Sequence, residues 1–233
     1  MRILIWGMVL LLPVAVKLLL GEWATVPTSS MSPTILPGDL IWYEKYSYGA
    51  VMPTRISELP LLNLLCLIPS VWNGDRQRDW GYHRIPGLCK PARMDIIVFR
   101  NPQNKHQLLT KRIIGLPGDT VAIHRNKVYI NGKLIDDIGN QQTGWVNADI
   151  GFPNDKRGVW TTQNYGPLPI PKNEGNEKEN CYFVMGDERG NSLDSRYIGC
   201  IPYPNIEGRV SSILYSPKAT DYGKATFFRE LNK

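Results

Sequence analysis

An apolar stretch at the N-terminus constrains this chain more than any other feature. From Ile3 to Leu20 it has a single charged residue, Lys17. As an α-helix rising about 1.5 Å per residue, the run extends roughly 27 Å, just enough to cross the hydrocarbon core of a bilayer. Because Lys17 lies close to the end of the run, its amine can reach the interface. We therefore predict an N-terminal transmembrane anchor over residues 1–22.

A cleaved secretory signal is the alternative interpretation of this segment. Such a signal needs small residues at positions −3 and −1 from the cut, and the following LGEWATV offers no clean pair. Arg2 and the amino terminus carry positive charge before the span, whereas no Lys or Arg lies between Lys17 and Lys45. The positive-inside rule therefore predicts a single-pass protein with a cytoplasmic N-terminus and residues 23–233 on the extracytoplasmic face.

Beyond the anchor, the sequence has the pattern of strands and turns. Short runs rich in β-branched and aromatic residues occur at Asp95–Phe99, Thr120–His124 and Lys127–Ile130. Asn131-Gly132 is a strong signal for a two-residue hairpin turn, and 21 Gly with 18 Pro favour many turns. No long amphipathic helix is evident. We predict a mainly β domain over residues 23–233, built as a sheet or a partly closed barrel with long loop insertions.

The predicted insertions lie at about residues 50–90 and 136–180. The second is polar and rich in Gly, Asn and Pro, so we expect loops. The first contains the apolar run Leu59–Ile68, which is too short to span a membrane. It is either a segment buried in the core or a loop that dips into membrane lipid, and the sequence leaves both open. Lipid binding by a chain beginning at Glu22, lost on Leu64→Asp with Leu65→Asp, would identify the membrane loop.

Several functional classes lack support in the sequence. The net charge of +6 and the pI of about 9.1 fit a solvated surface, and no basic run with interleaved aromatics predicts a nucleic-acid partner. No grouping has metal-ligand spacing and no glycine loop would cradle phosphate, so we expect no metal and no cofactor. His83, His106 and His124 lie apart from Ser-containing turns, and G-x-S-x-G is absent. A Ser-His-Asp hydrolase is therefore not indicated.

Three polar segments have an unusual composition: residues 27–39, 111–119 and 186–196. Taken singly, each is compatible with an ordinary turn. Together and in this order, they resemble the motifs of the bacterial type I signal peptidases. Ser30-Met-Ser-Pro-Thr34 is similar to the family's S-M-x-P-T box, and Lys111-Arg112 with IGLPGD is similar to its general-base box.

Two further boxes complete the resemblance. Arg93-Met94-Asp95 with IIVF is similar to R-G-D-I-V-V-F, and residues 186–196 are similar to G-D-N-R-x-x-S-x-D-S-R. Met94 stands where the family usually has Gly, and Glu188 stands where it usually has Asn. The resemblance covers most of the chain and leaves the insertions unmatched. It implies a membrane-bound serine endopeptidase that removes signal peptides from exported preproteins at a bacterial inner or plasma membrane.

The resemblance also implies roles for individual residues. Ser30 would attack the scissile carbonyl to form an acyl-enzyme, with Lys111 as general base. A lysine pKa near 10.4 must fall by roughly 3.4 units for half of the amines to be neutral at pH 7, and burial can lower it that far. Ser192 would orient Lys111. The Ser30 backbone N–H and the Thr28 hydroxyl would form the oxyanion hole.

The remaining implied roles concern support and specificity. Asp194 and Arg196 would form a structural ion pair. Small substrate residues at −3 and −1 predict shallow apolar pockets, and an extended substrate would add a strand beside Ser30 and Thr110. The matching pocket positions are Val26, Met31, Ile35, Val98 and Thr110, although core packing explains any one of them equally well.

Three other functions are alternatives to a general signal peptidase. A pilin-processing peptidase of a conjugative transfer system shares the Ser/Lys dyad, and the boxes do not separate it from a general signal peptidase, although the larger polar insertion favours the latter. A self-cleaving Ser/Lys repressor would need a helix-turn-helix where this chain has an apolar run. A catalytically silent binding protein is disfavoured because Ser30 and Lys111 are both present.

The chain has four cysteines: Cys66, Cys89, Cys181 and Cys200. With the predicted topology they would face an oxidising compartment. Because Cys181 and Cys200 flank the third polar segment on potential neighbouring strands, we hypothesise a disulfide between them. The alternative is a pair of small buried thiols.

Overall fold

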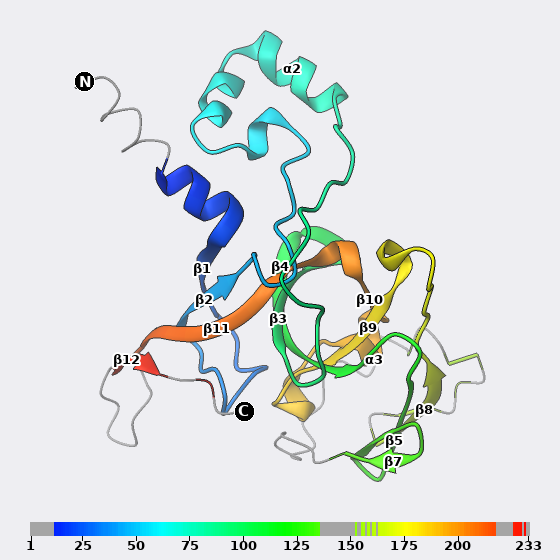
Figure 1. The fold of residues 1–233 in the computed structure, drawn as a ribbon. Coiled ribbons are helices and arrows are strands. Elements are labelled where there is room, and N and C mark those ends of the chain that lie inside the picture. The colour runs from blue at the N-terminus through cyan, green and yellow to red at the C-terminus, as the bar shows by residue number, and fades with distance from the viewer. Residues whose placement is uncertain are drawn as a thin grey trace. The chain divides into compact units, whose positions relative to one another are not determined.

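The structure, a computed structural model, describes residues 12–135, 152, 155–156, 158, 160–161, 163–217, 226–229 and 231. The chain divides into two compact units (Figure 1). The first comprises residues 1–22 and 44–90, and the second comprises residues 23–43 and 91–233. The predicted insertion at 50–90 thus falls in the same unit as the N-terminal segment, whereas residues 136–151 of the other predicted insertion lie outside the described residues.

The first unit contains the short helices of the chain's N-terminal third. Its N-terminal segment is helical from residue 12 and ends in the π-helical turn η1 (Val16–Leu20). The later part contains η2 (Ile56–Glu58), η3 (Leu62–Leu67) and α2 (Pro69–Gln77). No helix within the described part of the chain has the length and apolar character needed to cross a membrane. Residues 1–11 of the predicted anchor are outside that part.

Two antiparallel sheets form the second unit. The larger runs in the order β1-β2-β11-β3-β4-β9-β10, with β12 paired to β11, and the smaller runs β7-β6-β5-β8. The strands of the larger sheet are β1 (Gly21–Thr25), β2 (Leu40–Glu44), β3 (Ile96–Asn101), β4 (Asn104–Gly115), β9 (Cys181–Met185), β10 (Ile201–Pro202), β11 (Ile206–Ser216) and β12 (Thr226–Arg229). Those of the smaller sheet are β5 (Thr120–His124), β6 (Lys127–Ile130), β7 (Lys133–Leu134) and β8 (Asn164–Pro169).

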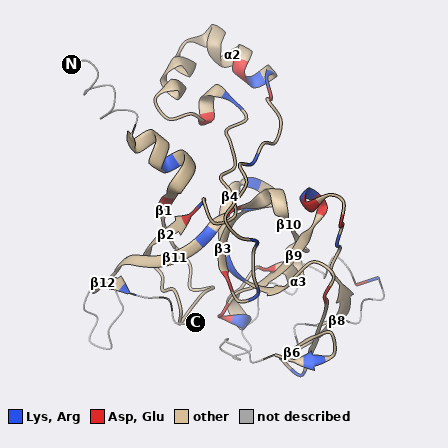
Figure 2. Ribbon diagram, viewed as in Figure 1, with Lys and Arg blue, Asp and Glu red and all other residues tan. Residues whose placement is uncertain are grey.

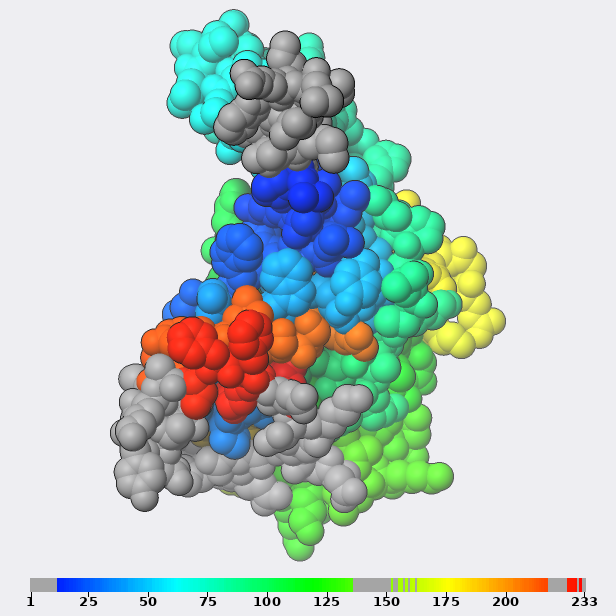
Figure 3. All heavy atoms as spheres, turned by 60° about the vertical axis from the view of Figure 1, so that its left-hand side comes forward, coloured from blue at the N-terminus to red at the C-terminus, as the bar shows by residue number. Residues whose placement is uncertain are grey.

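The mainly β class is confirmed. Within the described residues both sheets remain open, so the partly closed barrel that was the alternative to a sheet is not formed there. Short helical turns connect the strands of this unit: η4 (Glu177–Glu179), η5 (Arg189–Asn191), α3 (Ser195–Ile198) and η6 (Tyr203–Asn205). Strand β12, red in Figure 3, lies on the surface, where both of its phenylalanines are exposed.

The predicted hairpin at Asn131-Gly132 is confirmed. Both residues have positive φ, 51° and 78°, as the favoured two-residue hairpin turn requires. The turn joins β6 to β7. The Asn131 side chain secures it by accepting from the Thr120 N–H at 2.8 Å and donating to Asp119 at 2.8 Å.

The sequence L-P-G-D occurs twice and folds into the same turn each time. At Leu36–Asp39 and at Leu116–Asp119, the Asp N–H donates to the Leu carbonyl at 3.0 Å. The Asp carboxylate accepts from the Leu N–H, at 2.9 Å for Asp39 and 2.7 Å for Asp119. Each glycine has a positive φ, 95° and 90°, which a side chain would disfavour.

Asp39 connects the first of these turns to the C-terminal strands. Its fully buried carboxylate accepts from the Ser216 hydroxyl and from Arg229 Nη2, the latter at 2.9 Å. Its backbone carbonyl accepts from the Val26 N–H at 2.9 Å. Asp39 therefore closes the base of the loop over residues 26–39, which carries Ser30.

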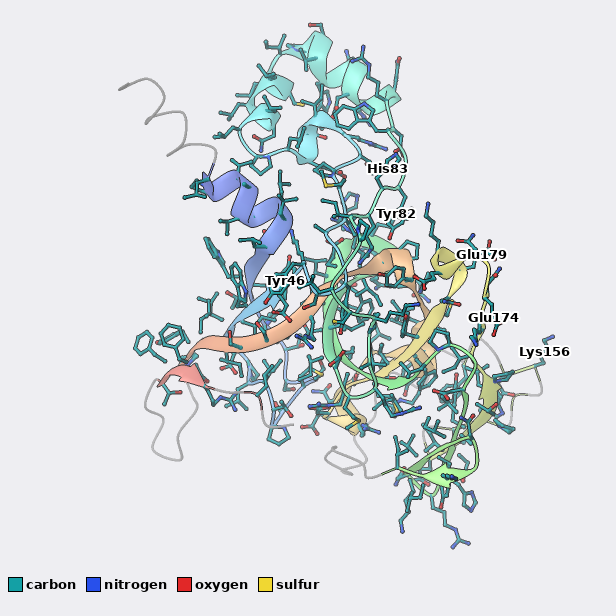
Figure 4. The ribbon with its side chains drawn as sticks, in the orientation of Figure 1. Tyr46, Tyr82, His83, Lys156, Glu174 and Glu179 are labelled. Carbon is teal, nitrogen blue, oxygen red and sulfur yellow. The ribbon has the colours of Figure 1, made fainter. Side chains whose placement is uncertain are left out.

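We expect Asp39→Ala to lower the free energy of unfolding by about 2–4 kcal/mol, because it leaves buried donors unpaired. Urea unfolding of the full chain in one detergent would measure the loss. Glu174→Ala is the matched control, since Glu174 lies on the exposed loop before β9 (Figure 4) and its pair with Lys172 is a surface one. An Asp39→Ala protein as stable as the control would contradict this account of the loop.

Candidate active site

Ser30 lies in a tight turn between β1 and β2. The Ser32 N–H donates to the Ser29 carbonyl at 2.8 Å, and the Ile35 N–H donates to the Met31 carbonyl at 2.9 Å. The Ser30 carbonyl accepts from the Glu188 N–H at 3.1 Å, which links the turn to the segment after β9. The Ser30 side chain is thus held in a fixed position, and the residue is only 7% exposed.

Lys111 reaches Ser30 from the buried half of β4. Strand pairing places Lys111 opposite Ile97 of β3. Its Nζ donates to Ser30 Oγ at 2.7 Å and to the Thr110 carbonyl at 2.9 Å. Lys111 is 3% exposed. The two residues, 81 positions apart in the sequence, therefore meet through a direct hydrogen bond inside the protein.

Burial lowers the pKa of Lys111 from 10.5 to about 8, because the ammonium form loses its hydration. The negative charges of Asp194 and Asp187 act in the opposite direction and keep the pKa from falling further. At pH 7 about one Lys111 amine in ten is then neutral, compared with about one in a few thousand for an ordinary lysine. The site therefore has a neutral amine within hydrogen-bond reach of a hydroxyl.

The predicted oxyanion and orienting residues both lie near this pair. Thr28 Oγ1 is 3.3 Å from Ser30 Oγ, and Thr28 is exposed to solvent. Ser192 is fully buried, no hydrogen bond joins its hydroxyl to the Lys111 amine, and its orienting role stays a prediction. Gly186 lies between Ser192 and the Ser30 carbonyl, and a Cβ at Gly186 would collide with both.

A buried ion pair lies behind the lysine. Arg112 contacts both carboxylate oxygens of Asp187, Nε to Oδ1 at 2.8 Å and Nη2 to Oδ2 at 2.6 Å. Thr34 Oγ1 donates to the same carboxylate at 2.6 Å, and Arg112 Nη1 donates to the Met94 carbonyl at 3.0 Å. This network joins all four of the sequence boxes. The sequence analysis did not predict this network, although Arg112 and Asp187 both lie in the boxes that carry the family resemblance.

The predicted Asp194–Arg196 ion pair is present. Arg196 Nε and Nη2 contact the two oxygens of Asp194 at 2.8 and 2.9 Å. Burial raises the pKa of Asp194, but the Arg196 charge and hydrogen bonds from Arg196 and the Gly186 N–H hold it below the ordinary value. Because the Gly186 N–H donates to Asp194 at 3.1 Å, this pair supports the backbone that adjoins Ser30.

The five predicted pocket residues divide into two groups. Thr110 is partly exposed beside Lys111. The other four are buried members of one apolar cluster with β2 and β11: Val26, Met31, Ile35 and Val98. In this structure those four side chains pack in the core, and their contact with a substrate stays a prediction.

Met94 shows why the family prefers glycine at its position. Its φ is 74°, a left-handed conformation that side chains disfavour. Its N–H donates to the Ile113 carbonyl at 2.8 Å and its carbonyl accepts from Arg112, so the backbone is held there from both sides. Although Met94 stands in place of the usual Gly, the backbone keeps this left-handed conformation.

The hypothesised Cys181–Cys200 disulfide is absent, and all four cysteines are free thiols. In the β9–β10 pairing, Cys181 lies opposite Pro202, two positions from Cys200. Burial raises the pKa of both thiols, that of Cys200 to about 12. Both are therefore partly buried thiols that remain protonated near neutral pH.

The described residues offer no site for metal chemistry and no buried histidine. The three histidines are exposed, and no group of three or more His, Cys, Asp or Glu in that part of the chain could hold a metal ion. The arrangement that remains is a buried serine–lysine pair with a partly exposed rim. Such a pair suits nucleophilic catalysis, since the lysine can accept the serine proton.

Comparisons with known proteins identify the family of the chain. Residues 2–215 match the family model described as "Signal peptidase, peptidase S26". Signal peptidase I of Rickettsia typhi is 31% identical over 229 residues, which cover 91% of this chain and 78% of the relative. A probable signal peptidase I-2 of Synechocystis is 29% identical, with 85% and 65% covered. A crystal structure of a signal peptidase I from Enterococcus faecalis is 34% identical, covering 52% of this chain and 97% of that one, with a TM-score of 0.37.

The protein is thus a hydrolase of the serine peptidase class. It belongs to the signal peptidase family, peptidase S26, and its relatives are named signal peptidase I. The activity this supports is cleavage of signal peptides from preproteins.

Lys111 should make the stability of the folded protein depend on pH. Because its folded pKa lies below its unfolded pKa, protonation favours the unfolded chain, and this cost falls as pH rises from about 8 to about 10.5. We expect Lys111→Met to be more stable than the natural chain by about 1–3 kcal/mol at pH 7, an advantage that shrinks by about 2 kcal/mol at pH 10.

Urea unfolding at both pH values would measure this difference. Lys127→Met is the control, because Lys127 is exposed on β6 and its replacement should matter little at either pH. A Lys111→Met protein that is destabilised at pH 7, or an advantage independent of pH, would show that the amine is not buried at a cost.

Proposed function

We propose that the protein is a membrane-bound endopeptidase that removes N-terminal signal peptides through a Ser30/Lys111 dyad. The observation that carries this proposal is the 2.7 Å hydrogen bond between Lys111 Nζ and Ser30 Oγ at a buried position. Burial supplies a neutral amine, and the tight turn presents the hydroxyl. A serine hydroxyl without such a base is a poor nucleophile.

Acylation follows from these positions. Ser30 Oγ attacks the scissile carbonyl carbon while its proton passes to Lys111 Nζ. The Ser30 N–H and the Thr28 hydroxyl, which lies at the exposed rim, donate to the oxygen on which negative charge develops. Lys111 then gives the proton to the departing amine of the mature protein. The peptide bond breaks, and the signal peptide remains as an ester on Ser30.

Deacylation reuses the same groups with water as the nucleophile. Lys111 accepts a proton from the attacking water and returns it to Ser30 Oγ as the ester breaks. The Thr110 carbonyl, 2.9 Å from Nζ, holds the amine in place during both steps. We assign to Ser192, which is buried beside Gly186, the role of accepting a hydrogen bond from the Lys111 amine once Ser30 is acylated.

The family membership supports the finer features of the proposal. We assign cleavage after small residues at −3 and −1, with the apolar cluster around Met31 and Ile35 forming the floor of the pockets. We assign an N-terminal anchor to the apolar run at residues 3–20, with the catalytic unit on the extracytoplasmic face. The relatives' names favour general signal-peptide processing over the pilin-processing alternative.

Two substitutions test the dyad. Ser30→Ala removes the nucleophile, and Lys111→Arg replaces the base with a guanidinium that stays protonated near neutral pH. Each should lower the cleavage of a preprotein with an A-x-A site by at least about 1,000-fold, measured by mass spectrometry of the released peptide.

The controls are Ser211→Ala and Lys127→Arg, which make the same chemical changes at exposed positions and should keep full activity. Retained activity in Lys111→Arg, with cleavage at the natural site, would refute the proposed base.

A further inference from the structure

The segment over residues 56–77 exposes an unusual amount of apolar surface. It comprises η2, η3 and α2 of the first unit. Six of its aliphatic side chains are exposed, with exposed fractions from 45% at Leu61 to 81% at Leu67. The exposed members of this leucine face are Leu61, Leu62, Leu64, Leu65, Leu67 and Ile68. Within the first unit, these side chains are therefore exposed and do not pack into a core.

The same segment is polar on its inside. From Val51 to Tyr82, a stretch that the structure describes in full, Asp75 is the one buried residue. Its carboxylate accepts from the Ile56 N–H at 2.8 Å and the Ser57 N–H at 3.2 Å, which ties α2 to η2. A water-soluble fold usually buries its leucines and exposes its carboxylates. This segment does the opposite, because Asp75 is buried and the leucines are exposed. This inversion indicates that the surrounding medium of the leucine face is apolar.

The backbone of the segment is suited to a medium without water. The Leu59, Asn63 and Leu64 N–H groups donate to carbonyls three or four residues earlier, at 3.0, 2.9 and 3.2 Å. The Ile68 and Trp72 N–H groups do the same at 3.1 and 3.0 Å. Internal pairing of this kind is required of backbone in contact with hydrocarbon.

Length and charge place the segment at the membrane surface. No charged residue occurs from Leu59 to Trp72. The six residues of η3 and the nine of α2 each extend only about 12–14 Å, much less than the thickness of a bilayer. Figure 2 draws the stretch between its ends in tan, with charged residues near the two ends. Such short apolar helices can enter the boundary between headgroups and acyl chains without crossing.

The rim of the leucine face matches the chemistry of anionic headgroups. Arg55 and Glu58 precede the uncharged stretch, and Arg76, Arg78 and Asp79 follow it, while Asp75 is buried. Outside the buried Asp75, three basic residues therefore stand against two acidic ones at the two ends. The Arg76 guanidinium lies over the Trp72 ring, 5.8 Å from its centroid, and Trp72 and Trp80 are exposed. Tryptophan and basic side chains are the usual residues at a membrane interface.

We propose that residues 59–72 insert into the headgroup–acyl boundary of an anionic phospholipid bilayer and form a second membrane attachment. The N-terminal apolar run belongs to the same compact unit, so both apolar segments can contact one bilayer. This attachment goes beyond the peptidase reaction and does not depend on the dyad. It therefore has a test that needs no turnover.

The full chain would be incorporated into vesicles of phosphatidylcholine with phosphatidylglycerol and exposed to a lipid-soluble diazirine. Peptide mass spectrometry would then map the labelled residues. We expect labelling within residues 59–72, at least fivefold weaker in the Leu64→Asp, Leu65→Asp variant. The control variant, Leu108→Asp with Leu134→Asp, changes two exposed leucines of the second unit and should keep the labelling.

Tryptophan fluorescence gives a second readout that keeps the leucines. Brominated acyl chains quench nearby indoles, so Trp72→Phe should remove more of the quenching than Trp160→Phe, whose ring packs against Tyr165 in the second unit. The proposal would be overturned if the diazirine labelled residues 1–20 but not residues 59–72, and if Trp72→Phe and Trp160→Phe removed equal amounts of the quenching. Cross-links showing the leucine face covered by the second unit or by another copy of the chain would also overturn it.

Discussion

The burial of one lysine amine beside one serine hydroxyl is the interaction on which the rest of the site depends. Lys111 lies in the buried half of β4, and β4 is paired with a strand on each side, β3 and β9. Desolvation there disfavours the ammonium and lowers its pKa to about 8. This burial destabilises the folded state at any pH where the Lys111 amine is protonated. Such a cost is typical of a functional position.

The surrounding structure holds this pair rather than adding chemistry to it. Successive residues of a strand point to opposite faces, so Lys111 reaches Ser30 while Arg112 reaches Asp187. Arg112 also holds the Met94 carbonyl, and Asp194 holds the Gly186 N–H. Both carboxylates raise the pKa of Lys111, but each is paired with an arginine. The ion pairs thus fix the backbone around the dyad with little loss of the neutral amine.

Local features could be predicted from the sequence, and long-range ones could not. The Asn131-Gly132 turn depends only on its own residues. The meeting of Ser30 with Lys111 came from the family resemblance, because no spacing relates residues 81 positions apart. The Arg112–Asp187 pair escaped prediction for the same reason. The apolar run Leu59–Ile68 fitted a core or a membrane equally well, and only the exposure of its leucines separated the two.

Direct titration of the Lys111 amine tests the central claim most directly. The full chain, labelled with ¹⁵N at lysine Nζ in detergent micelles, would be followed by NMR from pH 6 to pH 11. Comparison with Lys111→Arg would assign the resonance. The account predicts one lysine that titrates near pH 8, well apart from the exposed lysines. A Lys111 amine that titrates with them near pH 10.5 would contradict it.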